Sequence, residues 1–113
     1  MNAAMQWAGI FVLAAALGSP ARASAAVDEA DAKALLKASK CLTCHSVDKK
    51  KDGPAYKEVA SEYRDDPEAQ QKIVDWLSSE HDIEIDGEED THPMAKTKDV
   101  ARIGNLAAWV LSR

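Results

Sequence analysis

Apolar positions recur at helical spacing in four stretches of the chain after residue 25. The clearest lies at the C-terminal end, where the apolar stripe follows a capping residue, Thr97 or Asp99. The first of these stretches, residues 28–38, ends just before residue 41 and therefore positions the segment that begins there. The pattern predicts helices over 28–38, over 55–63, from about 64–68 (with Asp65 or Asp66 as cap) to Ser79, and over 99–111.

The helical periodicity is lost between residues 80 and 99. Residues 81–86 alternate polar and apolar side chains as a very short strand does, and residues 87–90 indicate an acidic turn. A long irregular stretch in a small domain is usually either functional or disordered. We expect a functional segment here.

The first 25 residues have the pattern of a secretory signal peptide. Their apolar run, residues 8–17, is too short to cross a bilayer, which needs roughly twenty residues. Small residues follow, and cleavage is predicted between residues 23 and 26, although no Lys or Arg precedes the run. An uncleaved anchor or a buried helix is the alternative. The sequence thus predicts export to the periplasm of one domain, 26–113, without stable membrane insertion.

The charge balance argues against nucleic acid as a partner. The chain has 19 Asp and Glu against 14 Lys and Arg, a formal net charge of -5 at pH 7. The carboxylates form a solvated surface, and no catalytic constellation is visible among them. The lysine run 49–51 indicates a solvated loop, or alternatively part of a docking rim for an acidic partner.

The candidate chemistry lies in residues 41–45, Cys-Leu-Thr-Cys-His. Two thiols separated by two residues, with a histidine next, are typical of c-type haem attachment. Cys41 and Cys44 each add across one haem vinyl group, and neighbouring vinyls require sulfurs that lie close together. His45 then supplies the proximal iron ligand. The predicted export agrees, because this haem is attached beyond the cytoplasmic membrane.

Three other uses of two cysteines remain open at this point. A thioredoxin-like redox pair would follow a strand of a βαβ unit, and no such strand is predicted. A zinc site would need four protein ligands, and His81 and His92 are too widely spaced for the usual histidine pair. A simple disulfide would leave His45 without a role.

The chain resembles the short bacterial class I cytochromes c, the monohaem cytochrome c551-like group in particular. The resemblance rests on residues 41–45, 53–60, 93–94 and 106–112 and covers nearly all of 26–113. It implies an all-α fold of about four short helices wrapped around one covalent haem c. It also implies that the first and last helices cross, and Gly104 would suit a close approach there.

The resemblance also implies two further site residues. Pro54 would accept the hydrogen bond from the second ring nitrogen of His45. Met94 would be the sixth iron ligand, and it is the only methionine in residues 26–113. His92, two residues earlier, is its rival, and an open sixth position is the third alternative. The family's Gly-rich, Trp-containing stretch and second proline are missing around Met94.

The resulting expectation is a periplasmic electron carrier, not an enzyme, with His45 and Met94 as axial ligands. Its partners would be cytochrome complexes, a terminal oxidase or reductase, or a periplasmic dehydrogenase. Three alternatives remain: a cytochrome subunit of a periplasmic oxidoreductase complex, a low-potential carrier ligated by His45 and His92, and a gas-binding or peroxidase-like haem protein.

Overall fold

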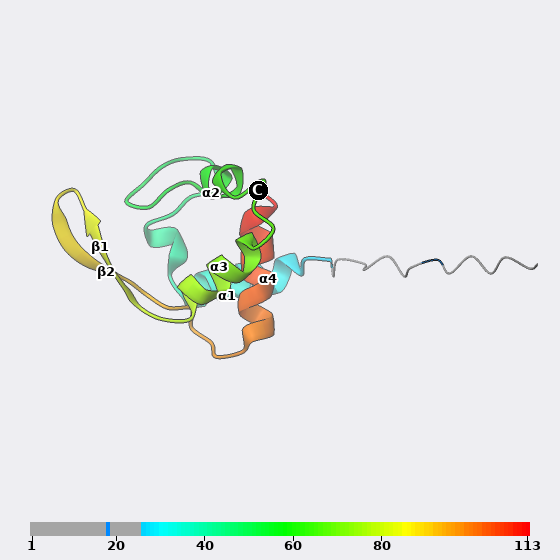
Figure 1. Ribbon diagram of the computed structural model, residues 1–113. Helices are drawn as coiled ribbons and strands as arrows, with labels where there is room; N and C mark the ends of the chain where they lie inside the picture. Colours follow the sequence, from blue (N-terminus) through cyan, green and yellow to red (C-terminus); the bar gives the residue numbers. More distant parts are fainter. Residues whose placement is uncertain (1–17, 19–25) are drawn as a thin grey trace, which may run out of the picture.

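The computed structural model describes Gly18 and residues 26–113, so the predicted signal peptide otherwise lies outside the described residues. None of the helices in this described part is both long and apolar enough to cross a membrane. The elements, in chain order (Figure 1), are α1 Glu29–Ala38, a 3₁₀ turn η1 Cys41–Thr43, α2 Tyr56–Glu62, α3 Ala69–Leu77, β1 His81–Ile85, β2 Glu88–His92 and α4 Val100–Leu111.

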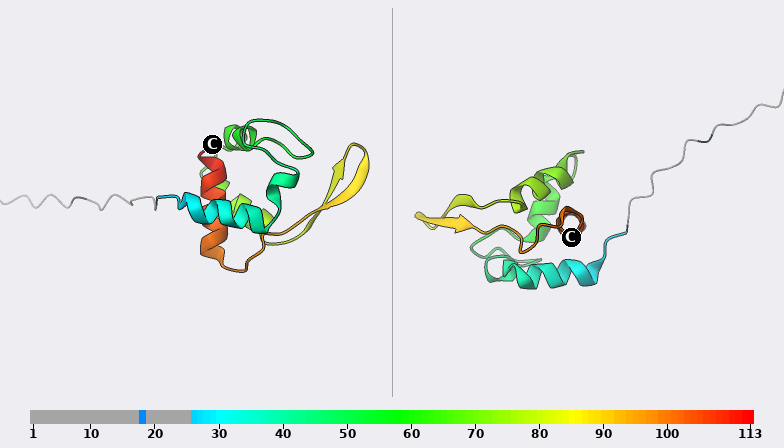
Figure 2. Two further views of the ribbon diagram at one scale, coloured as in Figure 1. Left: turned by 180° about the vertical axis from the view of Figure 1, so that it is seen from behind. Right: turned by 90° about the horizontal axis from the view of Figure 1, so that it is seen from below.

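The C-terminal helix α4 is the centre of the packing, because α1, α2 and α3 all contact it. Asp99 caps its start by accepting hydrogen bonds from the N–H groups of Ala101 and Arg102, as predicted. Figure 2 shows α1 lying across α4. One cluster of buried residues joins α4 to α1 and α2, and a second joins it to α3. The predicted crossing of first and last helices is therefore present.

Polar contacts fix the crossing of α1 and α4 at its rim. The side chain of Asn105 accepts a hydrogen bond from the backbone N–H of Asp28 at 2.8 Å and donates to the Asp28 carbonyl at 2.9 Å. Arg102 forms a two-point ion pair with Asp31 on the next turn of α1. These pairs set the register of the two helices, and with it the position of the segment that follows α1.

Gly104 does not have the role predicted for it. A Cβ atom added at this position would meet only the Gln70 side-chain nitrogen of α3, at an ordinary contact distance of 3.7 Å. The Gln70 amide donates to the Gly104 carbonyl at 2.9 Å. The glycine therefore faces α3 and not the α1 crossing, so the prediction is wrong on this point.

The third helix starts later than its capping pattern predicted. The carboxylate of Asp66 accepts a hydrogen bond from the backbone N–H of Glu68 at 2.8 Å, which closes a local turn before the helix. Pro67 lies in that turn, and the helix begins at Ala69. The aspartate thus stabilises a turn instead of capping a longer helix.

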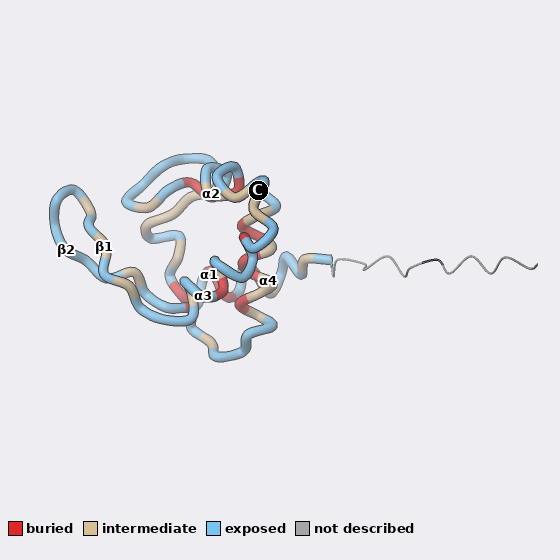
Figure 3. The backbone as a smooth tube through the Cα atoms, in the orientation of Figure 1, coloured by how far each residue is buried: buried red, intermediate tan, exposed pale blue. Residues whose placement is uncertain are grey.

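A two-stranded antiparallel hairpin, β1 and β2, projects from the helical part (Figures 1 and 2), so the purely all-α expectation is not confirmed. The predicted alternation over 81–86 is a strand, and His81 pairs with His92 in the register. The acidic stretch 87–90 is mostly the second strand. The turn is Asp86-Gly87, and both residues have positive φ, which is typical of a favoured two-residue hairpin turn. Figure 3 shows the hairpin largely exposed.

Candidate haem site

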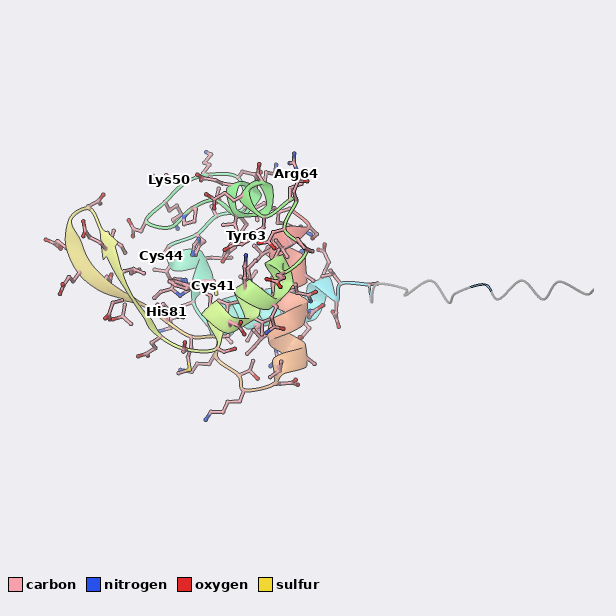
Figure 4. All side chains as sticks on the ribbon, in the orientation of Figure 1. Cys41, Cys44, Lys50, Tyr63, Arg64 and His81 are labelled. Atoms are coloured by element: carbon pink, nitrogen blue, oxygen red, sulfur yellow. The ribbon has the colours of Figure 1, made fainter. Side chains whose placement is uncertain are left out.

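The Cys-x-x-Cys-His segment directly follows α1 and is folded tightly. Lys40 takes a left-handed conformation with φ 57°, which turns the chain out of the helix into η1. The N–H of His45 then donates to the Cys41 carbonyl at 3.0 Å, closing one turn around the two cysteines. Cys41 and Cys44 are both free thiols and half-buried (Figure 4). Both sulfurs are thus chemically available.

The His45 ring is oriented by a backbone carbonyl. Its Nδ1 lies 2.7 Å from the carbonyl oxygen of Pro54, which has no hydrogen to offer, so Nδ1–H donates. Nε2 consequently carries the ring's lone pair and is the nitrogen able to bind a metal ion. The contact with Pro54 that the sequence resemblance implied is present, and such a bond fixes both tautomer and ring direction.

Gly53 and Tyr56 hold the same ring in place. A Cβ atom at Gly53 would lie 2.5 Å from His45 Cε1, so only glycine leaves room for the imidazole there. The Tyr56 ring stacks on His45 with centroids 4.9 Å apart and planes 18° apart. Tyr56 itself is buried and packs edge-on against Trp109 of α4, which ties the ligand to the core.

Cys41 has the protonation behaviour of a structural thiol. Burial raises its pKa, and the nearby Tyr56 hydroxyl offsets part of that effect. Burial also raises the pKa of Tyr56 far above its usual value, so the hydroxyl stays protonated and can donate to sulfur. A redox-active dithiol instead depends on a lowered cysteine pKa. This environment does not favour the thioredoxin-like alternative.

His92 and Met94 lie at the end of the hairpin and just after it. The ring centroid of His92 is 6.1 Å from that of His45, so the fold brings these two predicted site residues together. Burial lowers the pKa of His92, which keeps the imidazole neutral at pH 7. Met94 is 43% exposed, and the next residue, Ala95, is buried with its N–H donating to the Leu77 carbonyl at 2.8 Å.

Sequence reasoning missed a stack at the base of the hairpin. His81 lies flat on Trp76, with centroids 3.7 Å apart and planes 4° apart, and its Nε2 donates to the Trp76 carbonyl at 2.8 Å. The Trp76 ring also meets His92 edge-on at 5.4 Å. The tryptophan lies one turn before the end of a predicted helix and the histidine begins a predicted strand, and no local pattern links the two.

These residues fit a covalently held haem. Two free thiols lie beside an imidazole whose Nε2 is available, and glycine leaves the ring its space. Three of the four large apolar side chains exposed in the described chain belong to segments around this site: Leu42, Trp76 and Met94. Such exposed apolar groups suit an apolar cofactor that would cover them.

The profile of the cytochrome c family matches residues 29–113. Cytochrome c-551 of Pseudomonas aeruginosa is 32% identical over 74% of this chain and 77% of its own length. Cytochrome c-551 of Allochromatium vinosum is 50% identical, but over 35% of this chain and less than half, 43%, of its own length. The class 1 cytochrome MtoD of Sideroxydans lithotrophicus has 40% identity and a TM-score of 0.71, with 77% of this chain and 97% of MtoD covered.

The fold and the site thus define a protein of the class that carries a covalent haem. The chain belongs to the cytochrome c family, as a short monohaem class I member. It carries one haem c, and like its relatives it transfers electrons and is not an enzyme. The predictions of family, cofactor and general function are confirmed.

Proposed function

We propose that the chain is a periplasmic electron carrier whose single haem is attached through Cys41 and Cys44 and ligated by His45 and Met94. The observation that carries the proposal is His45 itself: Nδ1 is engaged by Pro54 at 2.7 Å, and Nε2 is free beside two free thiols. When bound, the haem supplies an iron that gains and loses one electron. His45 and Met94 would both hold that iron, so no position on it would be left for a substrate.

The surrounding residues keep the proximal ligand rigid. Pro54 fixes the tautomer of His45, Gly53 leaves the ring its space, and Tyr56 stacks on it. The Nδ1–H bond also raises the basicity of Nε2, which strengthens its bond to a metal. A ligand that does not move between oxidation states keeps the reorganisation on electron transfer small.

Three observations support Met94 as the sixth ligand. It is the only methionine in residues 26–113. Its side chain is 43% exposed, so no core packing would be lost when the thioether binds. The chain is also held on both sides of it, because His92 ends β2 near His45 and Ala95 is buried. A thioether ligand raises the reduction potential of a c-type haem.

Export and partners complete the proposal. Residues 1–25 would be removed as a signal peptide, leaving residues 26–113 in the periplasm, where haem attachment takes place. The partners would be other redox proteins: a cytochrome complex, a terminal oxidase or reductase, or a dehydrogenase. The exposed Lys49 and Lys50 next to the motif would meet an acidic surface on one of them.

Acid–acetone extraction and mass spectrometry test the proposal on protein purified from the periplasm. We expect the haem to remain with the polypeptide, and the mass to correspond to a chain beginning between Ser24 and Val27 plus one haem. Cys41→Ala and Cys44→Ala should prevent normal maturation, whereas Ser46→Ala next to the motif should not. Haem released into the solvent, or an intact Met1, would contradict attachment or export respectively.

A further inference from the structure

Two histidines of this chain, not one, present a free ring nitrogen at the site. His45 and His92 each direct Nδ1 to a proline carbonyl oxygen, at 2.7 Å to Pro54 and 3.0 Å to Pro93. A carbonyl oxygen only accepts, so Nδ1–H donates in both rings. In the neutral form of each ring the lone pair is then on Nε2, the nitrogen through which such an imidazole binds a metal ion.

The separation of the two rings suits ligands of one metal ion. Imidazole nitrogen lies about 2 Å from a bound first-row metal, so two rings on opposite sides of it have centroids about 6 Å apart. The ring centroids of His45 and His92 are 6.1 Å apart. Their planes differ by 61°, which rotation about a metal–nitrogen bond allows. His92 thus lies at a ligand distance without refolding of its segment.

The position of His92 is supported by the base of the hairpin. It pairs with His81 in the strand register, and His81 stacks on Trp76 at 3.7 Å. The Trp76 ring also contacts His92 edge-on at 5.4 Å. An isolated two-stranded hairpin is marginally stable, so this stack adds to the contacts that hold the end of β2 against the helical part.

We propose that His92 is a reserve ligand of the haem iron, which takes the sixth position when the Met94 sulfur leaves it. This rests on the haem attachment and Met94 ligation proposed above. In the exchange an iron–sulfur bond breaks and an iron–nitrogen bond forms. No electron is transferred, and the nitrogen binds through its lone pair. Only residue 93 separates the two ligands, so one short segment of the chain carries both of them.

The two ligands favour different oxidation states of the iron. The soft, uncharged thioether stabilises ferrous iron and raises the potential, whereas imidazole stabilises ferric iron better. Exchange therefore favours the oxidised protein and lowers its potential. The carrier would keep a closed iron and remain redox-active after losing its sulfur ligand, instead of exposing an open position.

The test removes the Met94 sulfur by substitution and identifies the ligand that then occupies the sixth position of the iron. Met94→Ala and Met94→Leu are both prepared as haem-loaded proteins. Leucine conserves the volume of the methionine, so a change seen in both variants comes from loss of the sulfur and not from altered packing. The ferric spin state is read by electron paramagnetic resonance, and the potential by titration. We expect both variants to stay low-spin, with a lower potential than the native protein. Adding His92→Ala to either should convert the ferric iron to high-spin.

A matched control removes the other histidine of the hairpin pair. Met94→Leu combined with His81→Phe keeps an aromatic ring on Trp76 but has no nitrogen to offer, and it should stay low-spin. High-spin iron in both single Met94 variants would overturn the proposal. Loss of the low-spin state in the His81→Phe combination would also overturn it.

The native protein separates this inference from the ligation on which it rests. With Met94 bound, the ferric protein shows the weak red-region absorption of a sulfur–iron bond, and His92→Ala alone leaves it unchanged. If that band is missing and the Met94 variants keep the native potential, His92 is the resident ligand. In that case the Met94 ligation and the reserve role of His92 are both wrong. If the Met94 variants are instead high-spin, only the reserve role of His92 is wrong.

Discussion

Gly53→Ala is the smallest change that should disturb the iron ligand. The new Cβ would lie 2.5 Å from Cε1, 2.8 Å from Nδ1 and 2.9 Å from Nε2 of His45. Ordinary contact begins at 3.4 Å, so the ring or the loop must move by about 0.9 Å. The loop has little freedom, because the Gly53 N–H donates to the Cys44 carbonyl at 2.8 Å.

The size of the effect follows from overpacking of a well-packed site. Extra methyl groups in such places destabilise by about 1–3 kcal/mol. If the bound ring stays in place, the loop retreats, and the hydrogen bond from Nδ1 to Pro54 is stretched, which adds about 1 kcal/mol. We expect the free energy of unfolding of the haem-loaded protein, from denaturant titration, to fall by about 2–4 kcal/mol.

Gly104→Ala is the matched control, with the opposite sign. Its new Cβ would touch only Gln70 at 3.7 Å, and the residue lies within α4. Alanine should therefore stabilise the protein by about 0.5–1 kcal/mol through helix propensity. Equal stability of the two variants, or a Gly53→Ala protein within about 0.5 kcal/mol of the native one, would refute the reasoning about the His45 ring.

Changes at three further positions test other parts of the structure by denaturant titration. Tyr56→Phe keeps the stack on the ligand and should change stability by less than about 1 kcal/mol, whereas Tyr56→Ala loses the stack and should cost about 3–5 kcal/mol. Asn105→Ala removes both bonds to Asp28 and should cost about 1 kcal/mol, with the haem spectrum unchanged. The hydrogen bond with Lys72 lowers the pKa of the Asp66 carboxyl below its usual 3.8. The ion pair therefore stabilises the folded protein above pH 3.8, and this contribution is lost as the pH falls through the lowered pKa of Asp66. Asp66→Asn should therefore destabilise at pH 6 and approach the native protein at acid pH; an equal deficit at both would contradict this.

The helices and the family could be predicted because they rest on local patterns. The apolar stripe and cap at Asp99 correspond to α4, and residues 41–45 define the haem chemistry through their spacing alone. The strand over 81–86 was visible in its alternation. Its partner was not identified, although Asp86-Gly87 is a strong two-residue turn signal.

The remaining features depend on contacts between distant residues. Gly104 was assigned to the wrong neighbour, because a glycine in a helix does not reveal which helix it faces. Asp66 could cap a helix or close a turn, and in the structure its carboxylate closes a turn by accepting from the Glu68 N–H. His92 and His45 lie 47 positions apart in the sequence, and the hairpin brings their rings together. No local sequence pattern could therefore predict this contact.

A spectroelectrochemical titration of the purified, exported protein tests the central proposal most directly. We predict one reversible one-electron transition of a low-spin c-type haem, with the red-region sulfur–iron band present in the ferric form and lost on reduction. A protein that shows no haem spectrum, or a haem whose ferric form is high-spin, would contradict a carrier ligated by His45 and Met94.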